Sequence, residues 1–207
     1  MSERSALRNA LIAAALLAAF AFVGVALVSV TETHTRPTIE ANERQFLRDT
    51  LDILVDPARY DNDPLADTVT VNAPDALGTA APVTVYRARR DGEPVALMLT
   101  AVAPDGYSGA IRLLIGINFD GTVAGVRVLA HRETPGLGDG IDAARSDWIL
   151  AFEGRSLSDP PAARWAVRRD GGVFDQFTGA TITPRAVIGA VRRALEYHQV
   201  MREELWR

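Results

Sequence analysis

Apolar residues form one long uninterrupted run near the N-terminus of this chain. From Ala10 to Val30 the sequence ALIAAALLAAFAFVGVALVSV contains no charged residue. As a helix, this run of about 21 residues would extend roughly 30 Å, the thickness of the hydrocarbon core of a bilayer. A single helix also satisfies its own backbone hydrogen bonds in lipid. The pattern therefore predicts a transmembrane helix over residues 10–30.

A cleaved signal peptide is the alternative interpretation of this run. Ala19-Phe20-Ala21 has the small-x-small pattern of a cleavage site. Further apolar or small residues follow it, so cleavage there would leave an apolar N-terminus. Valines occupy the end of the run, where they are poor cleavage residues. The retained anchor is the favoured interpretation.

Charges on either side of the run predict its orientation. Arg4 and Arg8 precede it, whereas the next arginine downstream is Arg36. The positive-inside rule then places residues 1–9 in the cytoplasm. We expect residues 31–207 to form a single domain, which in a bacterium would lie in the periplasm, with the anchor in the inner membrane.

Beyond the anchor, helical spacing gives way to strand-like patterns. Residues 38–55 predict a helix that continues from the anchor, and residues 57–64 are rich in Pro, Asp and Asn, which indicates a break. Strands are then expected over 68–71, 83–87, 95–103, 111–117 and 123–129. Asp120-Gly121, between the last two, is typical of a hairpin turn.

Helical patterns return towards the C-terminus. Residues 141–152 predict a helix, and residues 165–167 a short strand. In the final helix Thr183 is the expected N-cap and Pro184 the first helical residue, with His198 on the apolar face. Strands in the middle with helices on both sides indicate an α+β fold with a mostly antiparallel sheet and flanking helices. No alternating strand–helix units are present, which disfavours a parallel Rossmann sheet.

Composition and charge exclude several classes of function. The net charge is −4 and the chain has no cysteine, so neither nucleic-acid binding nor thiolate chemistry is expected. The sequence also has no lysine, which argues against a Schiff-base mechanism. Its three histidines lie far apart in the sequence, which argues against a metal site. No pair of side chains resembles a catalytic acid and base. We therefore predict no catalytic residue and expect any chemistry to come from a bound organic cofactor.

A threonine-rich turn precedes the final helix. Thr178, Thr181 and Thr183 alternate there, with Gly179 and Ala180 between the first two. A helix N-terminus presents unpaired N–H groups and a positive dipole end that favour a phosphate, and glycine allows a close approach of the backbone. A well-capped helix with spare threonines is the alternative interpretation.

A resemblance distinguishes between these alternatives. The pattern Asp175-x-x-Thr178-Gly179-Ala180-Thr181-x-Thr183 resembles the covalent flavinylation motif of the FMN-binding domain family. The resemblance implies that Thr181 carries one FMN per chain through a phosphoester, attached by a separate flavin transferase. Asp175 would orient the threonine or be read by the transferase; a solvated loop acid is the alternative.

A second segment resembles a narrower family. His131-Arg132-Glu133-Thr134-Pro135-Gly136-Leu137-Gly138 is similar to an element of the G subunit of Rnf ion-translocating oxidoreductases, and Gly106-Tyr107-Ser108-Gly109 is similar to another of its stretches. The resemblance implies a redox subunit that relays electrons between ferredoxin and NAD, coupled to Na⁺ or H⁺ movement. Its partners would be the other membrane and peripheral subunits of the complex, including a second subunit with covalent FMN.

The second segment also has a physical interpretation. Its Pro and Gly residues predict an irregular loop with exposed backbone groups. If FMN is bound, Glu133, Thr134 and the backbone of Leu137 and Gly138 would meet the polar edge of the isoalloxazine, and the Leu137 side chain its face. The alternative is a connector whose Gly and Pro serve only the turn.

Two further residues have open roles. His131 is either a structural hydrogen-bonding group or a proton carrier, and Tyr107 lies near the flavin or covers the sheet. For the whole chain, the alternatives to an electron carrier are a membrane-anchored flavoprotein sensor and a structural assembly subunit that is never flavinylated.

Overall fold

The computed structural model describes residues 3–207, which divide into two units at Arg48 and Asp49. Helix α1 (Glu3–Leu54) makes up the first unit and contributes its last residues to the second. Within α1, the segment Leu16–Arg36 is long and apolar enough to cross a membrane, judged by length and composition. Met1 and Ser2, at the start of the expected cytoplasmic segment, lie outside the described residues, as do the side chains of Arg4 and Arg8.

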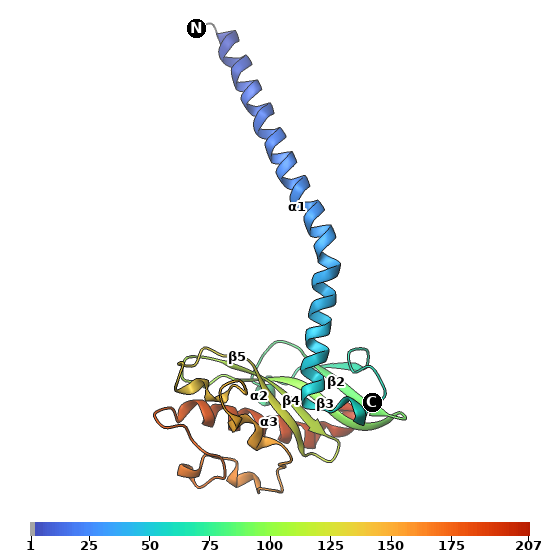
Figure 1. The fold of residues 1–207 in the computed structure, drawn as a ribbon, viewed down its shortest axis with the longest axis vertical. Helices are drawn as coiled ribbons and strands as arrows, with labels where there is room; N and C mark the ends of the chain where they lie inside the picture. The colour runs from blue at the N-terminus through green and yellow to red at the C-terminus, as the bar shows by residue number, and fades with distance from the viewer. Residues whose placement is uncertain (1–2) are drawn as a thin grey trace. The chain divides into compact units, whose positions relative to one another are not determined.

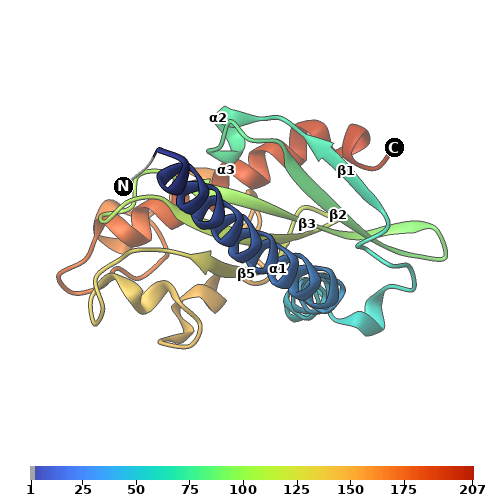
Figure 2. The same ribbon diagram turned by 90° about the horizontal axis from the view of Figure 1, so that it is seen from above.

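The second unit is built on a five-stranded antiparallel sheet in which each strand pairs with its neighbour in sequence. Figure 2 shows the sheet from above, with β1 and β5 on opposite sides of β2 and β3. The strands are β1 (Thr68–Val71), β2 (Val83–Arg90), β3 (Glu93–Ala103), β4 (Ile111–Asn118) and β5 (Val123–Ala130). The antiparallel sheet and all five expected strands are therefore confirmed, as is the turn at Asp120-Gly121, where Gly121 has a φ of 90°.

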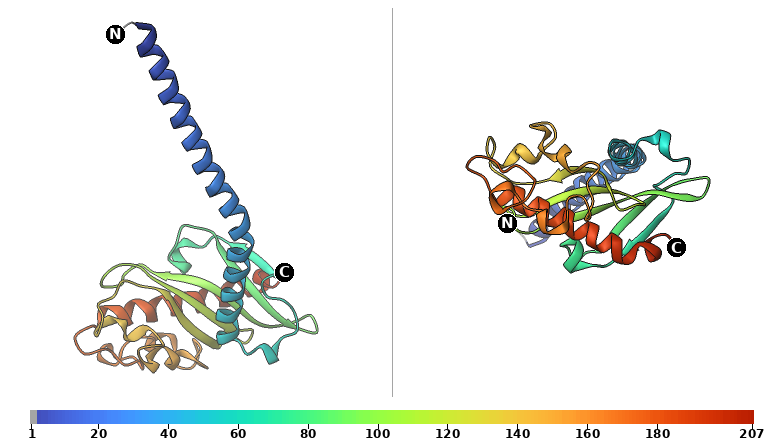
Figure 3. Two further views of the ribbon diagram at one scale, coloured as in Figure 1. Left: turned by 45° about the horizontal axis from the view of Figure 1, so that its top comes forward. Right: turned by 90° about the horizontal axis from the view of Figure 1, so that it is seen from below.

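Helix α3 (Ile182–Leu205) covers one face of this sheet (Figure 3). Its apolar side, which includes Val187 and Val191, is buried in one core with Leu99, Leu113 and Ile115 of the strands. His198 is also buried on this side, at 1% exposure, as its spacing predicts. The helix–sheet layer confirms the α+β class.

The last turn of α1 lies on the other face of the sheet. Leu51 and Leu54 are buried there, close to two glycines of the strands. A Cβ at Gly116 would lie 3.3 Å from the Leu54 Cβ, and one at Gly125 would lie 3.0 Å from the Leu54 Cδ2. Glycine is needed at these positions for the helix to come this close. Burial on both faces explains why β4 is apolar without alternation.

The segment between β5 and α3 is irregular and differs from the expected pattern. It contains four short 3₁₀ turns, η2 (Gly138–Ile141), η3 (Asp147–Phe152), η4 (Ala162–Arg164) and η5 (Arg168–Asp170). The expected helix over 141–152 and the expected strand over 165–167 are therefore wrong. A single bridge joins Val167 to Phe174.

Aromatic packing accounts for this irregular structure. Phe152 stacks on Phe174 with ring centroids 4.5 Å apart, and Trp148 and Trp165 pack against Phe152. These contacts bury side chains that come from turns, so tertiary packing rather than local periodicity sets the backbone. Figure 1 shows this segment beside one end of α3.

The other elements connect α1 to the sheet and border its first strands. They are η1 (Pro57–Arg59), which falls in the expected break, and α2 (Pro74–Leu77), which the sequence pattern does not predict. Leu77 of α2 is fully buried in the core, where this single turn contacts α3 and β3.

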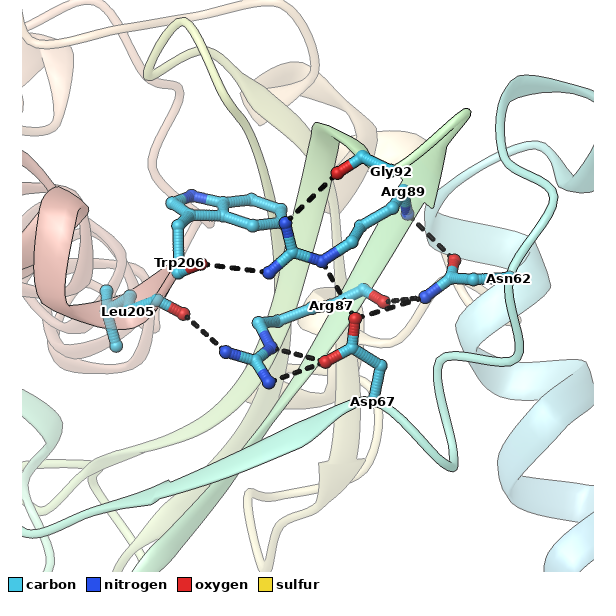
Figure 4. A network of polar contacts seen from close by, with 7 residues as sticks. All are labelled: Asn62, Asp67, Arg87, Arg89, Gly92, Leu205 and Trp206. Atoms are coloured by element: carbon cyan, nitrogen blue, oxygen red, sulfur yellow. Dashed lines mark hydrogen bonds and ion pairs between the residues drawn. The ribbon is translucent and has the colours of Figure 1, made fainter.

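A network of polar contacts holds the C-terminal end of α3 to β2 (Figure 4). The Asp67 carboxylate accepts hydrogen bonds from Arg87 at 2.6 Å and Arg89 at 2.8 Å. Arg89 donates to the Trp206 carbonyl at 2.9 Å, and Arg87 to the Leu205 carbonyl at 3.5 Å. Guanidinium groups are favourable at this end of a helix because its carbonyls carry partial negative charge.

Candidate functional site

A cleft of about 340 Å³ lies at the N-terminal end of α3. Three segments that are distant in sequence form it: 107, which follows β3; 133–138, which follows β5; and 179–183, which leads into α3. Because β3 and β5 both run antiparallel to β4, their carboxyl ends lie at the same end of the sheet. The topology therefore brings the first two segments together beside the helix.

Most of the residues that the sequence singled out line this cleft. The lining residues are Tyr107, Glu133, Thr134, Leu137, Gly138, Gly179, Ala180, Thr181, Ile182 and Thr183. The structure thus gathers the threonine-rich turn and the loop after β5 around one cavity, whose volume falls in the range of small-molecule sites.

Glu133 joins the three segments at the base of this cleft. Its side chain is 4% exposed. One carboxylate oxygen accepts the Ser108 backbone N–H at 2.9 Å, and the other accepts the Thr183 hydroxyl. The Glu133 backbone N–H in turn donates to Nδ1 of His131 at 3.1 Å. Both oxygens of a buried acid are therefore satisfied within the protein, as burial of a charge requires.

Two glycines permit this close packing. A Cβ at Gly138 would lie 2.9 Å from both the Glu133 Cβ and the Thr183 Oγ1, and one at Gly106 would lie 3.0 Å from a Glu133 carboxylate oxygen and 2.2 Å from the Gly109 carbonyl oxygen. One glycine of each segment, Gly106 and Gly138, therefore allows the backbone to approach a buried acid. This is a structural role that the spacing of glycines in the sequence does not specify.

Helix α3 begins two residues earlier than the sequence predicts. Ile182 is its first residue and Thr181 is the N-cap, so the prediction of Thr183 as N-cap and Pro184 as first residue is wrong. The hydroxyl of Thr183, which would have to cap the helix, instead donates to Glu133 and is buried. A tertiary hydrogen bond has replaced the expected local one.

Thr181 occupies the N-cap position without acting as a conventional cap. Its side chain makes no capping hydrogen bond to the described residues, although threonine at this position usually accepts one from the helix. Thr181 is half-buried and lines the cleft. Its hydroxyl is thus held at the helix N-terminus but not used by the helix.

Three of the predicted site residues do not line the cleft. Thr178 is exposed in the preceding turn. The exposed Asp175 carboxylate pairs with Arg168 at 3.0 Å, while its backbone carbonyl accepts the Trp148 indole N–H at 2.7 Å. His131 contacts the base of the cleft by accepting the Glu133 backbone N–H at Nδ1.

Two residues contribute to the cleft without having been predicted. Ile182 lines it with 45% of its surface exposed, and it occupies the variable position of the threonine motif, which carries no residue-type signal. Ser108 contributes through its backbone N–H, which every non-proline residue has. Tyr107, at 68% exposure, borders the cleft and does not cover the sheet core.

The charge distribution around the cleft is simple. Among the described residues that line it, Glu133 has the only charged side chain. Arg185, one turn beyond Thr181, pairs with both carboxylate oxygens of Asp170 at 2.7 and 2.8 Å. This hydrogen bond lowers the pKa of Asp170 and raises that of Arg185. An anion in the cleft would therefore depend on the helix N-terminus and backbone N–H groups.

Comparison with known proteins agrees with both resemblances. The model of the FMN-binding domain matches residues 106–196, and that of the RnfG N-terminal region matches residues 1–54. The first match contains every residue that lines the cleft.

Three relatives, each described as the G subunit of an ion-translocating oxidoreductase complex, are similar over nearly their whole lengths. The protein from Pseudomonas aeruginosa is 51% identical over 204 residues, covering 99% of this chain and 94% of the relative. The protein from Vibrio cholerae is 48% identical over 190 residues, covering 92% of this chain and 90% of the relative. The protein from Cereibacter sphaeroides is 45% identical over 195 residues, covering 94% of this chain and 87% of the relative.

Proposed function

The chain belongs to the family of G subunits of ion-translocating oxidoreductase complexes, and on this premise we propose that it carries electrons on one FMN held covalently at Thr181. The observation that supports this most directly is the position of the Thr181 hydroxyl. It lies in the cleft at the start of α3 and makes no capping hydrogen bond to the described residues. A phosphoester there would use a hydroxyl that the fold leaves available.

The surroundings of the three threonines favour Thr181 over its neighbours. Thr183 is 1% exposed and donates its hydroxyl proton to Glu133, so it is inaccessible to a transferase. Thr178 is exposed but does not line the cleft, so FMN attached there would begin outside it. Of the three, only Thr181 combines access with a place in the cavity.

The lining residues fit FMN in size and chemistry. The first turn of α3 places N–H groups and the positive helix end beside an ester at Thr181, and Gly179, with a φ of 81°, keeps the approach uncrowded. Leu137, Ile182 and Tyr107 offer exposed apolar surface to the ring, and Thr134 offers polar groups. FMN supplies the electron-transfer chemistry when bound, while the protein orients it and tunes its electronics.

The same proposal includes a place in the cell. Residues 10–30 would cross the inner membrane, with residues 1–9 in the cytoplasm and residues 31–207 in the periplasm. The apolar window Leu16–Arg36 and the family support membrane attachment, and the arginines before it support the orientation.

The proposed partners follow from the family. They are the membrane and peripheral subunits of an Rnf-type complex, one of them with its own covalent FMN, and the flavin transferase that matures this chain. The complex would relay electrons between ferredoxin and NAD and move Na⁺ or H⁺. Neither ferredoxin nor NAD would bind to this chain.

Flavin fluorescence of the denatured chain in a gel tests the attachment. The full chain is co-expressed with a flavin transferase in the periplasm as wild type, Thr181→Val and Thr181→Ser. We expect a fluorescent wild-type band, none for the valine variant and recovery with serine, because serine restores a hydroxyl. The mass of the flavin-bearing peptide then identifies the ester.

Two outcomes would favour the alternatives. A dark wild-type band, with the transferase active on another substrate, would support an assembly subunit without flavin. A fluorescent chain whose Thr181→Ala variant leaves electron transfer by the whole complex intact would support a sensor.

A further inference from the structure

Glu133 is a buried charge for which flavin attachment provides no role. We propose that its carboxylate holds the reduction potential of a flavin in this cleft below the value that a neutral side chain would allow. This inference rests on the proposed function, because it requires flavin in the cleft. It assigns Glu133 a tuning role through charge, distinct from holding the cofactor by contact.

The structure fixes this charge in place. The carboxylate accepts hydrogen bonds from the Ser108 N–H and the Thr183 hydroxyl, which belong to two segments far apart in the sequence. The backbone of Gly138 packs closely against Glu133, since a Cβ there would be 2.9 Å from the Glu133 Cβ. Glu133 is 4% exposed. The surrounding protein therefore screens its charge far less than water screens the charge of a surface acid.

No described cation in the lining of the cleft compensates this charge. Arg185 is bound to both oxygens of Asp170. Asp139, the next acid in the loop, accepts the Gly136 N–H at 2.8 Å and lies 3.7 Å from Arg145. His131 accepts a hydrogen bond at Nδ1, so that atom bears no proton. Among the described residues that line the cleft, the charges that act are therefore one carboxylate and the positive end of the α3 helix dipole.

A fixed negative charge disfavours reduction of its neighbour. An oxidised flavin takes up two electrons, with one proton to form an anion or two protons to form a neutral species. When an electron arrives before its proton, the flavin gains a negative charge that the carboxylate repels. This repulsion is stronger in a protein cleft than in water. The reduced form is destabilised relative to the oxidised form, which lowers the potential. Charge near the flavin ring is a recognised means of tuning it.

Spectroelectrochemical titration of the flavinylated full-length chain in detergent tests the proposal. Wild type, Glu133→Gln and Asp139→Asn are titrated at one pH, with dithionite as the electron donor that is itself oxidised to sulfite. We expect Glu133→Gln to shift the midpoint potential to a more positive value, because it removes the charge while keeping the size. Asp139→Asn is the matched control, an acid-to-amide change in the same loop outside the cleft lining, and should shift it much less.

A second variant covers the case in which Glu133→Gln does not fold or load flavin. Thr183→Val removes a donated hydrogen bond but keeps the carboxylate, so the unshielded charge should move the potential to a more negative value than wild type.

The outcomes separate this inference from the proposed function. An unchanged potential in flavinylated Glu133→Gln, or an equal shift in Asp139→Asn, would overturn the tuning role. If Glu133→Gln does not fold or load flavin, a midpoint potential of Thr183→Val at or above the wild-type value would also overturn the tuning role. A wild-type chain without covalent flavin, detected in the gel of the same preparation, would overturn the proposed function and this inference with it.

Discussion

The two ends of helix α3 are built in opposite ways. At the C-terminal end, Arg87 and Arg89 donate to the Leu205 and Trp206 carbonyls, and the Asp67 carboxylate pairs with both guanidinium groups (Figure 4). At the N-terminal end, the N-cap residue Thr181 makes no capping hydrogen bond to the described residues, and a cleft lies beside it.

The difference separates stabilisation from function. Polar groups at a helix end must be satisfied by caps, water or ligands. The C-terminal end is satisfied by side chains from β2 and the segment before β1, and Arg89 also stacks over Trp206 at 5.0 Å. At the N-terminal end the nearest acid, Glu133, is directed to Thr183 and Ser108. The fold therefore uses its polar side chains to close one end and keeps the other available.

The largest effect is expected from adding a methyl group in the cleft at the N-terminal end of α3. Gly138→Ala would place a methyl group 2.9 Å from Glu133 and Thr183, which forces the cleft segments apart. We expect loss of the covalent flavin band and a decrease of up to about 3 kcal/mol in the free energy of unfolding. Urea unfolding and in-gel flavin fluorescence measure the two effects.

Gly136→Ala provides the matched control in the same loop. A Cβ at Gly136 meets no described atom within 4 Å, and its φ is 77°, so only backbone strain opposes the substitution. It should lower stability by about 1 kcal/mol and leave flavinylation intact. Equal loss of flavin in both variants would contradict the role of close packing at Gly138.

The next largest effect is expected from disrupting the polar network at the C-terminal end of α3. Asp67→Asn leaves Arg87 and Arg89, which are 14% and 19% exposed, without their carboxylate. Partly buried charges that lose a partner are costly, so we expect the free energy of unfolding to fall by about 2–3 kcal/mol. Flavinylation should stay at the wild-type level, because the network lies at the other end of α3; a dark band would contradict this separation.

Low pH should lower the free energy of unfolding through His198, which is buried in α3. Burial and, to a smaller extent, the nearby Arg202 lower the pKa of His198 to about 4, against the opposing effect of Asp120. The unfolded chain therefore binds a proton near pH 6.5, whereas the folded chain does so only near pH 4, and stability falls as the pH drops through this window. Between pH 7.5 and pH 5 the loss is about 2 kcal/mol.

Urea unfolding at the two pH values measures this loss. His198→Gln keeps a polar side chain of similar size without a proton to gain, so its stability should change less over the same pH range. A pH dependence as steep as that of the wild type would assign the effect to another group.

The smallest expected effect concerns the exposed pair beside the cleft. Asp170→Asn releases Arg185 from its carboxylate, but exposed ion pairs contribute little to stability. We expect the urea midpoint and the flavin band to stay at wild-type values. A marked gain in flavinylation would show that freed Arg185 serves the phosphate.

The sequence by itself determined much of the architecture. Alternating or continuous apolar stretches and the turn at Asp120-Gly121 predicted the strands and a mostly antiparallel sheet, because these are local properties of the chain. The two motifs also marked which residues would gather, and most of them line one cleft. Attachment of FMN to Thr181 stays a prediction from the motif.

Tertiary structure alone decided the details on which the site depends. Thr183 had the local features of an N-cap, yet its hydroxyl is committed to Glu133 from a distant loop, and the helix begins at Ile182 instead. Residues 141–152 had helical spacing, yet aromatic packing holds them in 3₁₀ turns. A periodic pattern reports which face is buried, but the choice among hydrogen-bond partners depends on which segments the fold brings within about 3 Å of one another. For this reason the buried acid at the base of the cleft became visible only in three dimensions.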